Sequence, residues 1–428
     1  MKNRKALALI AIIALVAAAC GGADEVVEEK VVETTEAPAT TEAPAETTAP
    51  ASDPLVLASL MPLSGDLASL GPGIALGAAI AVEQINAAGG INGQPVVLIE
   101  GDSGCDGAVA LTSLNDAIAQ GAQGVMGAAC SGTSLAILDT AIAAQVVMVS
   151  PSNTSPQFTT TDTKGFYART APSDLLQGDV LASLLVEDGV QTVSIISRAD
   201  SYGRGLAEAT AAAFEAAGGT VKTIVYHATD ASEFTSEVTA VGKGGPDAIV
   251  GILFPETGCG VLQPAFEQGL LDIPWYMTDG VKDAGLASLC GLGTALDGFK
   301  GTAPGSAAGE ALEAFKSAYA AASADGSDNF IFAPQAYDAV MLMAISAAAN
   351  GVTGPEIAAG LAAASSGGTK CIGVECIALA AAGEDVDYVG ASGEIELDEN
   401  GDPTASTYDI WTTEGDTNPV LKSVDFGS

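Results

Sequence analysis

Basic residues are scarce in this sequence. Only 15 lysines and arginines stand against 53 aspartates and glutamates, which gives a formal net charge of −38 over 428 residues. Proteins that bind nucleic acid need a basic surface, so this composition excludes nucleic acid as a partner. Histidine is scarcer still, because His227 is the single one. Metal sites and acid–base catalysis that rely on several histidines are therefore excluded too.

Motifs for catalysis and for phosphate binding are also missing. The sequence has no G-x-S-x-G turn and no Gly-Lys-Ser/Thr phosphate loop. Gly71-Pro72-Gly73 with Gly77 resembles a dinucleotide loop, but the third glycine comes one residue late and no acidic residue ends the second strand, although Glu100 comes close. A helix-entry loop is the better interpretation. Because a catalytic triad could use only His227, we expect neither an enzyme nor a cofactor.

What the sequence does contain is enough apolar material to fold. The chain is 48% hydrophobic, too apolar to stay disordered despite its charge. Its length allows two or three domains with real cores.

The N-terminus is predicted to be a targeting segment, residues 1–20. Positive residues precede an apolar run at 6–19, which is too short for a membrane span. The run ends in Val-Ala-Ala-Ala followed by Cys20, which resembles a bacterial lipoprotein signal in which the cysteine is lipidated and becomes the new N-terminus. Such signals usually have Leu where Ala17 stands. An ordinary secretory signal is the alternative.

Residues 21–53 are predicted to be a solvated tether. The unit TTEAPA occurs at 34–39 and again at 40–45, and this composition favours extended conformers that bury nothing. Fully extended, the segment could reach about 100 Å. It carries a charge of −8 and leaves −33 on residues 54–428, so the acidity belongs to the body of the protein. A lipid and a long tether would place that body outside the cytoplasm, anchored to the membrane through Cys20.

Six cysteines remain after Cys20, an even number that suits an oxidising compartment. No C-x-x-C pair exists and His227 is remote in sequence, so we expect no zinc or other metal site. Fifteen pairings are possible in principle. We expect neighbours along the chain to pair: Cys105 with Cys130, Cys259 with Cys290, and Cys371 with Cys376.

The body is predicted to be an α/β fold, because short apolar strands alternate with helices from residue 54 onward. A first run has strands at 55–61, 95–99, 124–128 and 146–150 with helices at 73–88, 107–120 and 134–144. A second run has strands at 192–198, 221–226, 247–253 and 275–278 with helices at 203–217, 233–242 and 260–269. Continuous apolar strands alternating with helices predict two doubly wound parallel sheets. Ligands in such folds bind beyond the carboxyl ends of the strands.

Two loops at such ends are rich in small hydroxyl residues, at 127–134 and 150–156. Hydroxyls there can cap free backbone N–H groups at the start of a helix. The same groups, with the helix dipole, make an anion site. Simple capping explains either loop alone, but two adjacent loops of this kind favour a carboxylate held by Ser131 and Thr154.

Several motifs together resemble the branched-chain amino-acid-binding family, the type I periplasmic binding proteins of ABC importers. The resemblance spans about 54–428 and is carried by Pro62-Leu63-Ser64-Gly65, residues 82–93 (VEQINAAGGING), Asp102-Ser103-Gly104-Cys105-Asp106, Ser150-Pro151-Ser152-Asn153-Thr154, Ser201-Tyr202-Gly203-Arg204-Gly205 and a late hairpin at 393–402. It implies two lobes, joined by three crossovers, that close on a ligand like a flytrap. Lobe 1 would comprise 54–173 and 304–403, and lobe 2 would comprise 174–303 and 404–428.

The resemblance also implies roles for single residues. Ser131 and Thr154 would bind an α-carboxylate, and the Ser152 carbonyl and Asp279 would bind an α-ammonium. Tyr202 would lie over the ligand, and the Cys105–Cys130 disulfide would brace the Ser131 loop. Further expected ligand-binding residues are Leu70, Asp174 and Phe254.

This sequence departs from the family at three of these positions. Some relatives have an aromatic residue where Leu70 stands. The loop at 253–258 aligns only after a one-residue shift, so that Leu253 could replace Phe254. Asp279 is a methylene shorter than the Glu of relatives, so a water could intervene between it and the ammonium.

The leading hypothesis is a lipid-anchored receptor that delivers a small solute, an aliphatic amino acid, to an ABC permease. A sensor that signals through a membrane partner is the alternative, and an amide, urea or carboxylate is the alternative ligand. The acidic body disfavours strongly anionic solutes.

Overall fold

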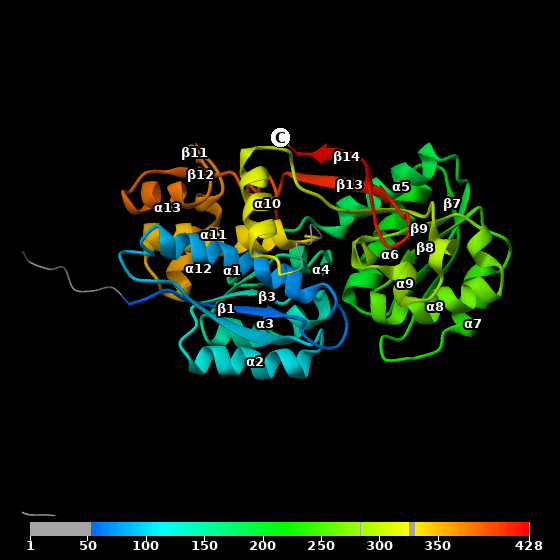
Figure 1. Cartoon of the computed structure of the whole chain (residues 1–428), viewed down its shortest axis with the longest axis horizontal. Coiled ribbons are helices and arrows are strands. Elements are labelled where there is room, and N and C mark those ends of the chain that lie inside the picture. The colour runs from blue at the N-terminus through cyan, green and yellow to red at the C-terminus, as the bar shows by residue number, and fades with distance from the viewer. Residues whose placement is uncertain (1–52, 283, 325–329, 428) are drawn as a thin grey trace, which may run out of the picture. The chain divides into compact units, whose positions relative to one another are not determined.

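The computed structural model describes residues 53–282, 284–324 and 330–427, which belong to one compact unit of the chain. The predicted signal with Cys20, and the predicted tether apart from Asp53, lie outside the described residues. Two β-sheets, each covered by helices, form the core of this unit (Figure 1). We call the five-stranded sheet with its helices lobe 1 and the seven-stranded sheet with its helices lobe 2.

Lobe 1 is built on a parallel sheet with the strand order β2-β1-β3-β4-β5. Every residue of β3 and β4 is buried, which explains why these strands are continuously apolar instead of alternating. The strands are β1 (Val56–Met61), β2 (Val97–Asp102), β3 (Gly124–Gly127), β4 (Val147–Ser150) and β5 (Tyr167–Arg169). The connecting helices are α1 (Gly71–Ala87), α2 (Gly107–Ala119), α3 (Ser131–Ala143) and α4 (Gln157–Thr160).

Lobe 2 has the strand order β14-β13-β10-β9-β8-β6-β7. Strands β6 to β10 are parallel, and the sequence predicts the first four of them but not β10. Strands β13 and β14 add an antiparallel edge that the sequence did not reveal. The strands are β6 (Thr192–Arg198), β7 (Thr220–His227), β8 (Ala248–Ile252), β9 (Trp275–Met277), β10 (Lys300–Pro304), β13 (Ser406–Thr412) and β14 (Val420–Phe426). The helices are α5 (Asp174–Glu187), α6 (Ser201–Ala216), α7 (Thr235–Gly242), α8 (Pro255–Glu267) and α9 (Leu286–Leu289).

A second set of helices returns to lobe 1. It comprises α10 (Glu310–Ala322), α11 (Ala333–Asn350), α12 (Gly354–Ala364) and α13 (Val374–Ala381), with the short pair β11 (Thr369–Cys371) and β12 (Val386–Tyr388). Helix α11 packs against α1, α12 and α13, and all its residues from Ala333 to Ala347 are buried. The predicted hairpin at 393–402 contains only isolated antiparallel bridges, between Val389 and Glu394 and between Leu397 and Pro403.

The chain passes three times between the two sheets: from β5 to α5, from β10 to α10, and from the bridged segment to β13. The fold class is therefore the predicted one, with two parallel-sheet α/β lobes joined by three crossovers. The residues at which the predicted lobes divide, 173, 303 and 403, stay a prediction.

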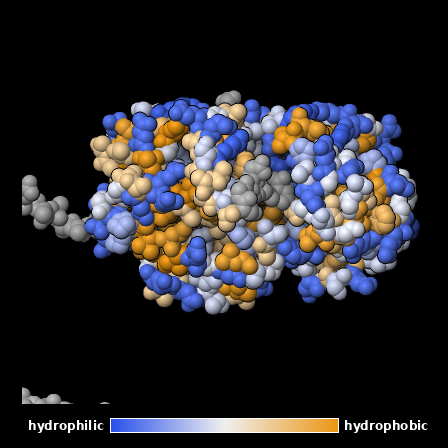
Figure 2. Space-filling model, viewed as in Figure 1, coloured by the Kyte–Doolittle hydropathy of each residue, from blue (hydrophilic) through white to orange (hydrophobic). Residues whose placement is uncertain are grey.

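Three disulfides lie in the described part of the chain, and each joins neighbours along the sequence. They link Cys105 to Cys130, Cys259 to Cys290 and Cys371 to Cys376. None of the helices that the structure describes is both long and apolar enough to cross a bilayer. Hydrophilic residues are spread widely over the face seen in Figure 2, in keeping with the acidity of residues 54–428.

Candidate ligand-binding site

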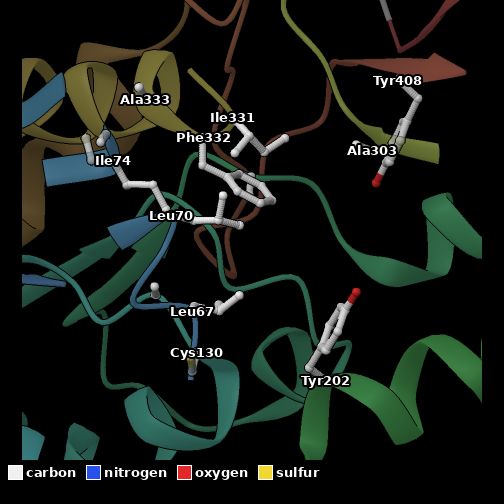
Figure 3. Packing of buried hydrophobic residues seen from close by; sticks show 14 of the residues in the cluster. Leu67, Leu70, Ile74, Cys130, Tyr202, Ala303, Ile331, Phe332, Ala333 and Tyr408 are labelled. Carbon is white, nitrogen blue, oxygen red and sulfur yellow. The ribbon is translucent and has the colours of Figure 1, made fainter. Parts of the chain in front are cut away.

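A narrow cavity, partly open to solvent, lies between the two lobes (Figure 3). Its walls come from segments that follow the carboxyl ends of β1, β3, β4, β6, β8 and β9. The one exception is a residue that precedes α11. Its lining residues are Leu67, Leu70, Ile74, Ala129, Cys130, Ser131, Ser152, Tyr202, Phe254, Asp279, Gly280 and Phe332.

The lobe 1 side of the cavity is formed by the loops after β3 and β4, which are tied to each other. The Ser150 hydroxyl donates to the Ala128 carbonyl at 2.9 Å, and the Ser152 hydroxyl donates to the Ala129 carbonyl at 3.1 Å. The Asn153 amide donates to both carbonyls, at 3.0 and 2.8 Å. These bonds fix the two loops side by side, so that Ser131 and Ser152 face the same cavity.

Helix α3 begins at Ser131, three residues earlier than the sequence predicts, and no side chain caps its first turn. The Ser131 hydroxyl instead accepts from the Ser155 N–H at 3.4 Å, and the Ser134 hydroxyl donates to the Ala128 carbonyl. The interpretation of these hydroxyls as helix caps is therefore wrong for this loop. Because the positive end of the helix is left uncapped beside the cavity, it can bind an anionic group.

Arg169 holds the second loop from behind. It forms a buried ion pair with Asp402, with Nε to Oδ1 at 2.6 Å, and its Nη1 donates to the carbonyls of Asn153 and Ser155 at 3.2 and 2.9 Å. A buried arginine satisfied in this way orders the loop without presenting its charge to the cavity. No cation from lobe 1 therefore lines the anion-binding side.

The lobe 2 side of the cavity is acidic. Asp279 Oδ1 accepts from Gln177 Nε2 at 2.8 Å and from the Tyr202 hydroxyl at 2.9 Å, and the Tyr202 oxygen lies 2.9 Å from Thr278 Oγ1. Asp279 is almost fully buried, and burial raises the pKa of its carboxyl to about 6. No basic side chain lines this cavity to neutralise the charge. A cationic group on a ligand would do so.

Behind Asp279 lies a second buried acid, Asp174, on the first turn of α5. Burial, reinforced by the nearby charge of Asp279, raises the pKa of Asp174 well above its ordinary value. The Thr154 hydroxyl lies close enough to Asp174 to lower that pKa somewhat, but within the described residues neither carboxylate oxygen nor this hydroxyl forms a hydrogen bond of ordinary geometry. Buried polar groups without partners are rare and are expected where a ligand or water completes the site.

The remaining walls are apolar. Phe254 stacks on Tyr202, with ring centroids 5.4 Å apart, and Leu67, Leu70 and Phe332 approach from lobe 1 (Figure 3). Ile74 extends the same surface one helical turn beyond Leu70. These side chains leave a hydrophobic space next to the polar groups.

The structure thus brings together six of the eight residues predicted to bind ligand. These six are Leu70, Ser131, Ser152, Tyr202, Phe254 and Asp279. Thr154 and Asp174 are fully buried next to the cavity but do not line it. Leu253, the alternative to Phe254, is buried in the core and does not line it either.

Sequence reasoning missed Leu67, Ile74 and Phe332. Leu67 and Ile74 lie three and four residues from Leu70, so helical spacing could have indicated them. Phe332 has a positive φ of 60° directly before Ala333-Pro334, where α11 begins. A bulky residue held in this conformation is uncommon, but the sequence alone does not show it.

A larger and more open groove, of about 1430 Å³, lies between α10 and the turn that joins β13 to β14. Its lining includes the pair of Lys282 with Asp409, joined at 3.3 Å. The smaller cavity is the candidate ligand site, because the uncapped end of α3 borders it and the buried Thr154 and Asp174 lie next to it. The described residues contain no cluster of His, Cys, Asp and Glu that could hold a metal ion.

Two parallel-sheet α/β lobes with a cavity between them define a class of proteins that hold a small solute between their lobes. Comparison with known protein families assigns the chain to one family within this class. Residues 54–398 match the periplasmic binding protein family, and the chain belongs to that family. Membership implies a location outside the cytoplasm.

Two relatives from Pseudomonas aeruginosa are named as amino-acid-binding proteins. The chain is 32% identical over 237 residues to an amino acid binding protein of Pseudomonas aeruginosa, covering 54% of this chain and 62% of that protein. It is 29% identical over 247 residues to a leucine-, isoleucine-, valine-, threonine- and alanine-binding protein of the same organism, covering 57% and 64%. The chain therefore spans slightly less than two thirds of the length of these relatives.

Solved structures share the fold at lower identity. A leucine binding protein of Thermotoga maritima superposes with a TM-score of 0.73 at 22% identity, covering 86% of this chain and 98% of that one. A solute binding protein of an ABC transporter from R. palustris, in complex with benzoate, gives a TM-score of 0.70 at 19% identity over 88% and 98%. One fold thus holds different solutes, so the residues of the cavity must decide between them.

Proposed function

We propose that this protein captures an aliphatic L-amino acid between its lobes and delivers it to the permease of an ABC importer. The observation that carries the proposal is that a site for an anionic group and a site for a cationic group face each other across one cavity. Lobe 1 presents Ser131 and the uncapped start of α3, which suit a carboxylate. Lobe 2 presents Asp279, which suits an ammonium.

A zwitterion in this cavity would bridge the lobes and favour the closed state. Its carboxylate would bind to lobe 1 and its ammonium to lobe 2, so that neither lobe alone satisfies the ligand. A ligand of this kind shifts the equilibrium toward closure because it makes its full set of contacts only there. Asp174, Thr154 and the Ser152 carbonyl are further candidates to complete the polar shell.

The apolar walls support an aliphatic side chain. Leu67, Leu70, Ile74, Phe254 and Phe332 offer no polar atom beyond their backbones. One relative from Pseudomonas aeruginosa is named for binding leucine, isoleucine, valine and alanine, which agree with this chemistry, and also threonine. Lipidation at Cys20 and a tether at 21–53 complete the proposal, since they would keep the receptor near its permease.

Thermal unfolding of the full chain with a panel of ligands tests the proposal. The panel contains L-leucine, L-isoleucine, L-valine, L-alanine, isovaleramide, isovalerate, urea and benzoate. We expect the branched amino acids to raise the Tm, because a ligand that binds only the folded state stabilises it. Stabilisation by isovalerate or benzoate, without any by an α-amino acid, would show that Asp279 does not bind an ammonium.

A further inference from the structure

One segment of lobe 1 is fastened to lobe 2 at two points outside the cavity. Asp66 Oδ2 forms an ion pair with Arg198 Nη2 at 2.8 Å. The backbone N–H of the next residue, Leu67, donates to Glu256 Oε2 at 2.9 Å. Arg198 ends β6 and Glu256 begins α8, so the two bonds reach separate elements of lobe 2.

Arg198 is 2% exposed, and its guanidinium also has three contacts within lobe 2. Its Nε donates to Asp200 Oδ2 at 2.8 Å and its Nη1 to Thr257 Oγ1 at 3.3 Å. Its central carbon lies 3.9 Å from the ring centre of Phe254, so the planar cation stacks on that ring. Phe254 lines the ligand cavity, whereas Arg198 does not.

The segment held by these bonds carries Leu67 and Leu70, which line the cavity opposite Phe254. The ion pair and the hydrogen bond therefore join the two apolar walls that would enclose a ligand side chain. A separate contact joins the lobes elsewhere, where the Ser155 hydroxyl donates to the Ser201 carbonyl at 3.0 Å. That contact lies beside the polar end of the cavity and is independent of Arg198.

We propose that Arg198 is a positioning residue that, together with Glu256, latches the Asp66–Leu67 segment onto lobe 2. Opening of the lobes breaks both bonds, and closure restores them while it brings Leu67 and Leu70 to Phe254. The latch thus sets how long a ligand stays bound, although none of Asp66, Arg198 and Glu256 touches the cavity. It rests on the proposed function only through the choice of L-leucine as a probe.

The first arm of the test measures L-leucine binding kinetics by stopped-flow on the full chain. Asp66→Asn keeps the size of the side chain and removes the charge that pairs with Arg198. We expect L-leucine to dissociate about tenfold faster, while its association rate stays within about twofold of wild type. Loss of a short-range ion pair acts mainly on the dissociation rate. Asp66→Glu retains the charge and should restore most of the residence time. In Arg198→Gln, adding Asp66→Asn should have almost no further effect.

The matched control is Asp200→Asn. It removes a charge from the same arginine, but within lobe 2, and asparagine preserves the cap that Asp200 provides to the Gly203 N–H. Asp200→Asn should change the dissociation rate of L-leucine far less than Asp66→Asn does. Equal effects of the two variants would overturn the latch, since Arg198 would then act only within lobe 2.

The second arm does not depend on ligand identity. Hydrogen exchange of the peptide that spans residues 63–70 reports the Leu67 N–H, which is protected only when Glu256 accepts it. Asp66→Asn should speed this exchange severalfold, with and without L-leucine, and Asp200→Asn should not. If wild type fails to bind L-leucine while this exchange pattern appears, the amino-acid assignment fails and the latch stands. If the exchange is the same in all variants, the latch fails.

Discussion

Two buried acids in this protein have opposite surroundings. Asp338, on α11 in lobe 1, accepts from the Tyr388 hydroxyl at 2.7 Å, from the N–H groups of Ala391 and Ser392 at 2.7 and 2.8 Å, and from the Ser392 hydroxyl at 2.5 Å. Asp279, at the interlobe cavity, accepts from only two side chains. Asp174 behind it has no hydrogen bond of ordinary geometry among the described residues, although the Thr154 hydroxyl lies nearby.

The difference separates a structural acid from a functional one. The partners of Asp338 come from its own lobe and hold the segment after β12 in place. Those of Asp279 leave part of its carboxylate free toward a cavity. Burial raises the pKa of both groups, so burial or a raised pKa alone does not identify the binding site. The binding site is identified by the number of hydrogen-bond donors to each acid and by the segments that supply them.

The largest expected effect is on ligand binding by Asp279→Asn. The amide has nearly the same shape but no charge to pair with an ammonium. We expect L-leucine affinity, measured by calorimetry, to fall by about 100-fold or more. The ligand-free variant should unfold at the same temperature as wild type or a few degrees higher, because a buried charge without a cation is removed. A marked loss of stability would place Asp279 in the same structural group as Asp338.

Asp338→Asn should have the opposite profile. The N–H groups of Ala391 and Ser392 donate to different oxygens of Asp338, so the new amide nitrogen would face one of them and leave that buried donor unpaired. We expect the free energy of unfolding, from urea titration, to fall by about 2–4 kcal/mol. L-Leucine affinity of the folded fraction should stay within about twofold of wild type. A large loss of affinity at unchanged stability would contradict the comparison.

The pH dependence of binding should follow Asp279. Its pKa in the ligand-free protein is about 6, so the carboxylate is ionised at pH 7 and protonated at pH 5. L-Leucine affinity should therefore fall about tenfold from pH 7 to pH 5. Because the folded pKa lies above the unfolded one, the carboxyl favours the folded, ligand-free protein below about pH 4, and this contribution is lost as the pH rises through 6. Asp279→Asn should remove the dependence of affinity on pH, whereas the buried Asp174 should keep part of the dependence of stability.

A smaller effect should distinguish two hydroxyls near the cavity. Thr154→Val removes a buried hydroxyl that lies near Asp174 but forms no hydrogen bond of ordinary geometry among the described residues. Stability should therefore change by less than about 0.5 kcal/mol, while L-leucine affinity falls about fivefold. Ser150→Ala removes an oxygen that accepts from the Ser152 and Asn153 N–H groups. It should lower the free energy of unfolding by about 1–2 kcal/mol. Equal stability losses would show that both hydroxyls are structural.

The parts of the fold predicted best from the sequence have local signals. Strands such as Ala248–Ile252 are short, apolar and preceded by turn residues. Ser131, Ser152 and Asp279 follow strand ends, where parallel sheets collect their ligands. Helix α11 gives no such signal: it is buried on all sides, so it lacks the apolar stripe of an amphipathic helix.

Other features depend on contacts between segments far apart in the chain. Phe332 and Leu70 line the same cavity although more than half of the described sequence separates them. Asp66 pairs with Arg198 of the other lobe. The capping interpretation failed for a related reason. In the loop after β3 the Ser134 hydroxyl bonds to the Ala128 carbonyl instead of to a free N–H group, a choice that depends on how two loops meet.

A crystal structure of the full chain grown with L-leucine would test the central claim most directly. We predict a carboxylate at Ser131 and the first turn of α3, an ammonium within hydrogen-bond distance of Asp279, directly or through one water, and the isobutyl group among Leu67, Leu70, Phe254 and Phe332. A bound ligand that leaves Asp279 without a cationic partner, or that lies in the larger groove beside α10, would contradict it.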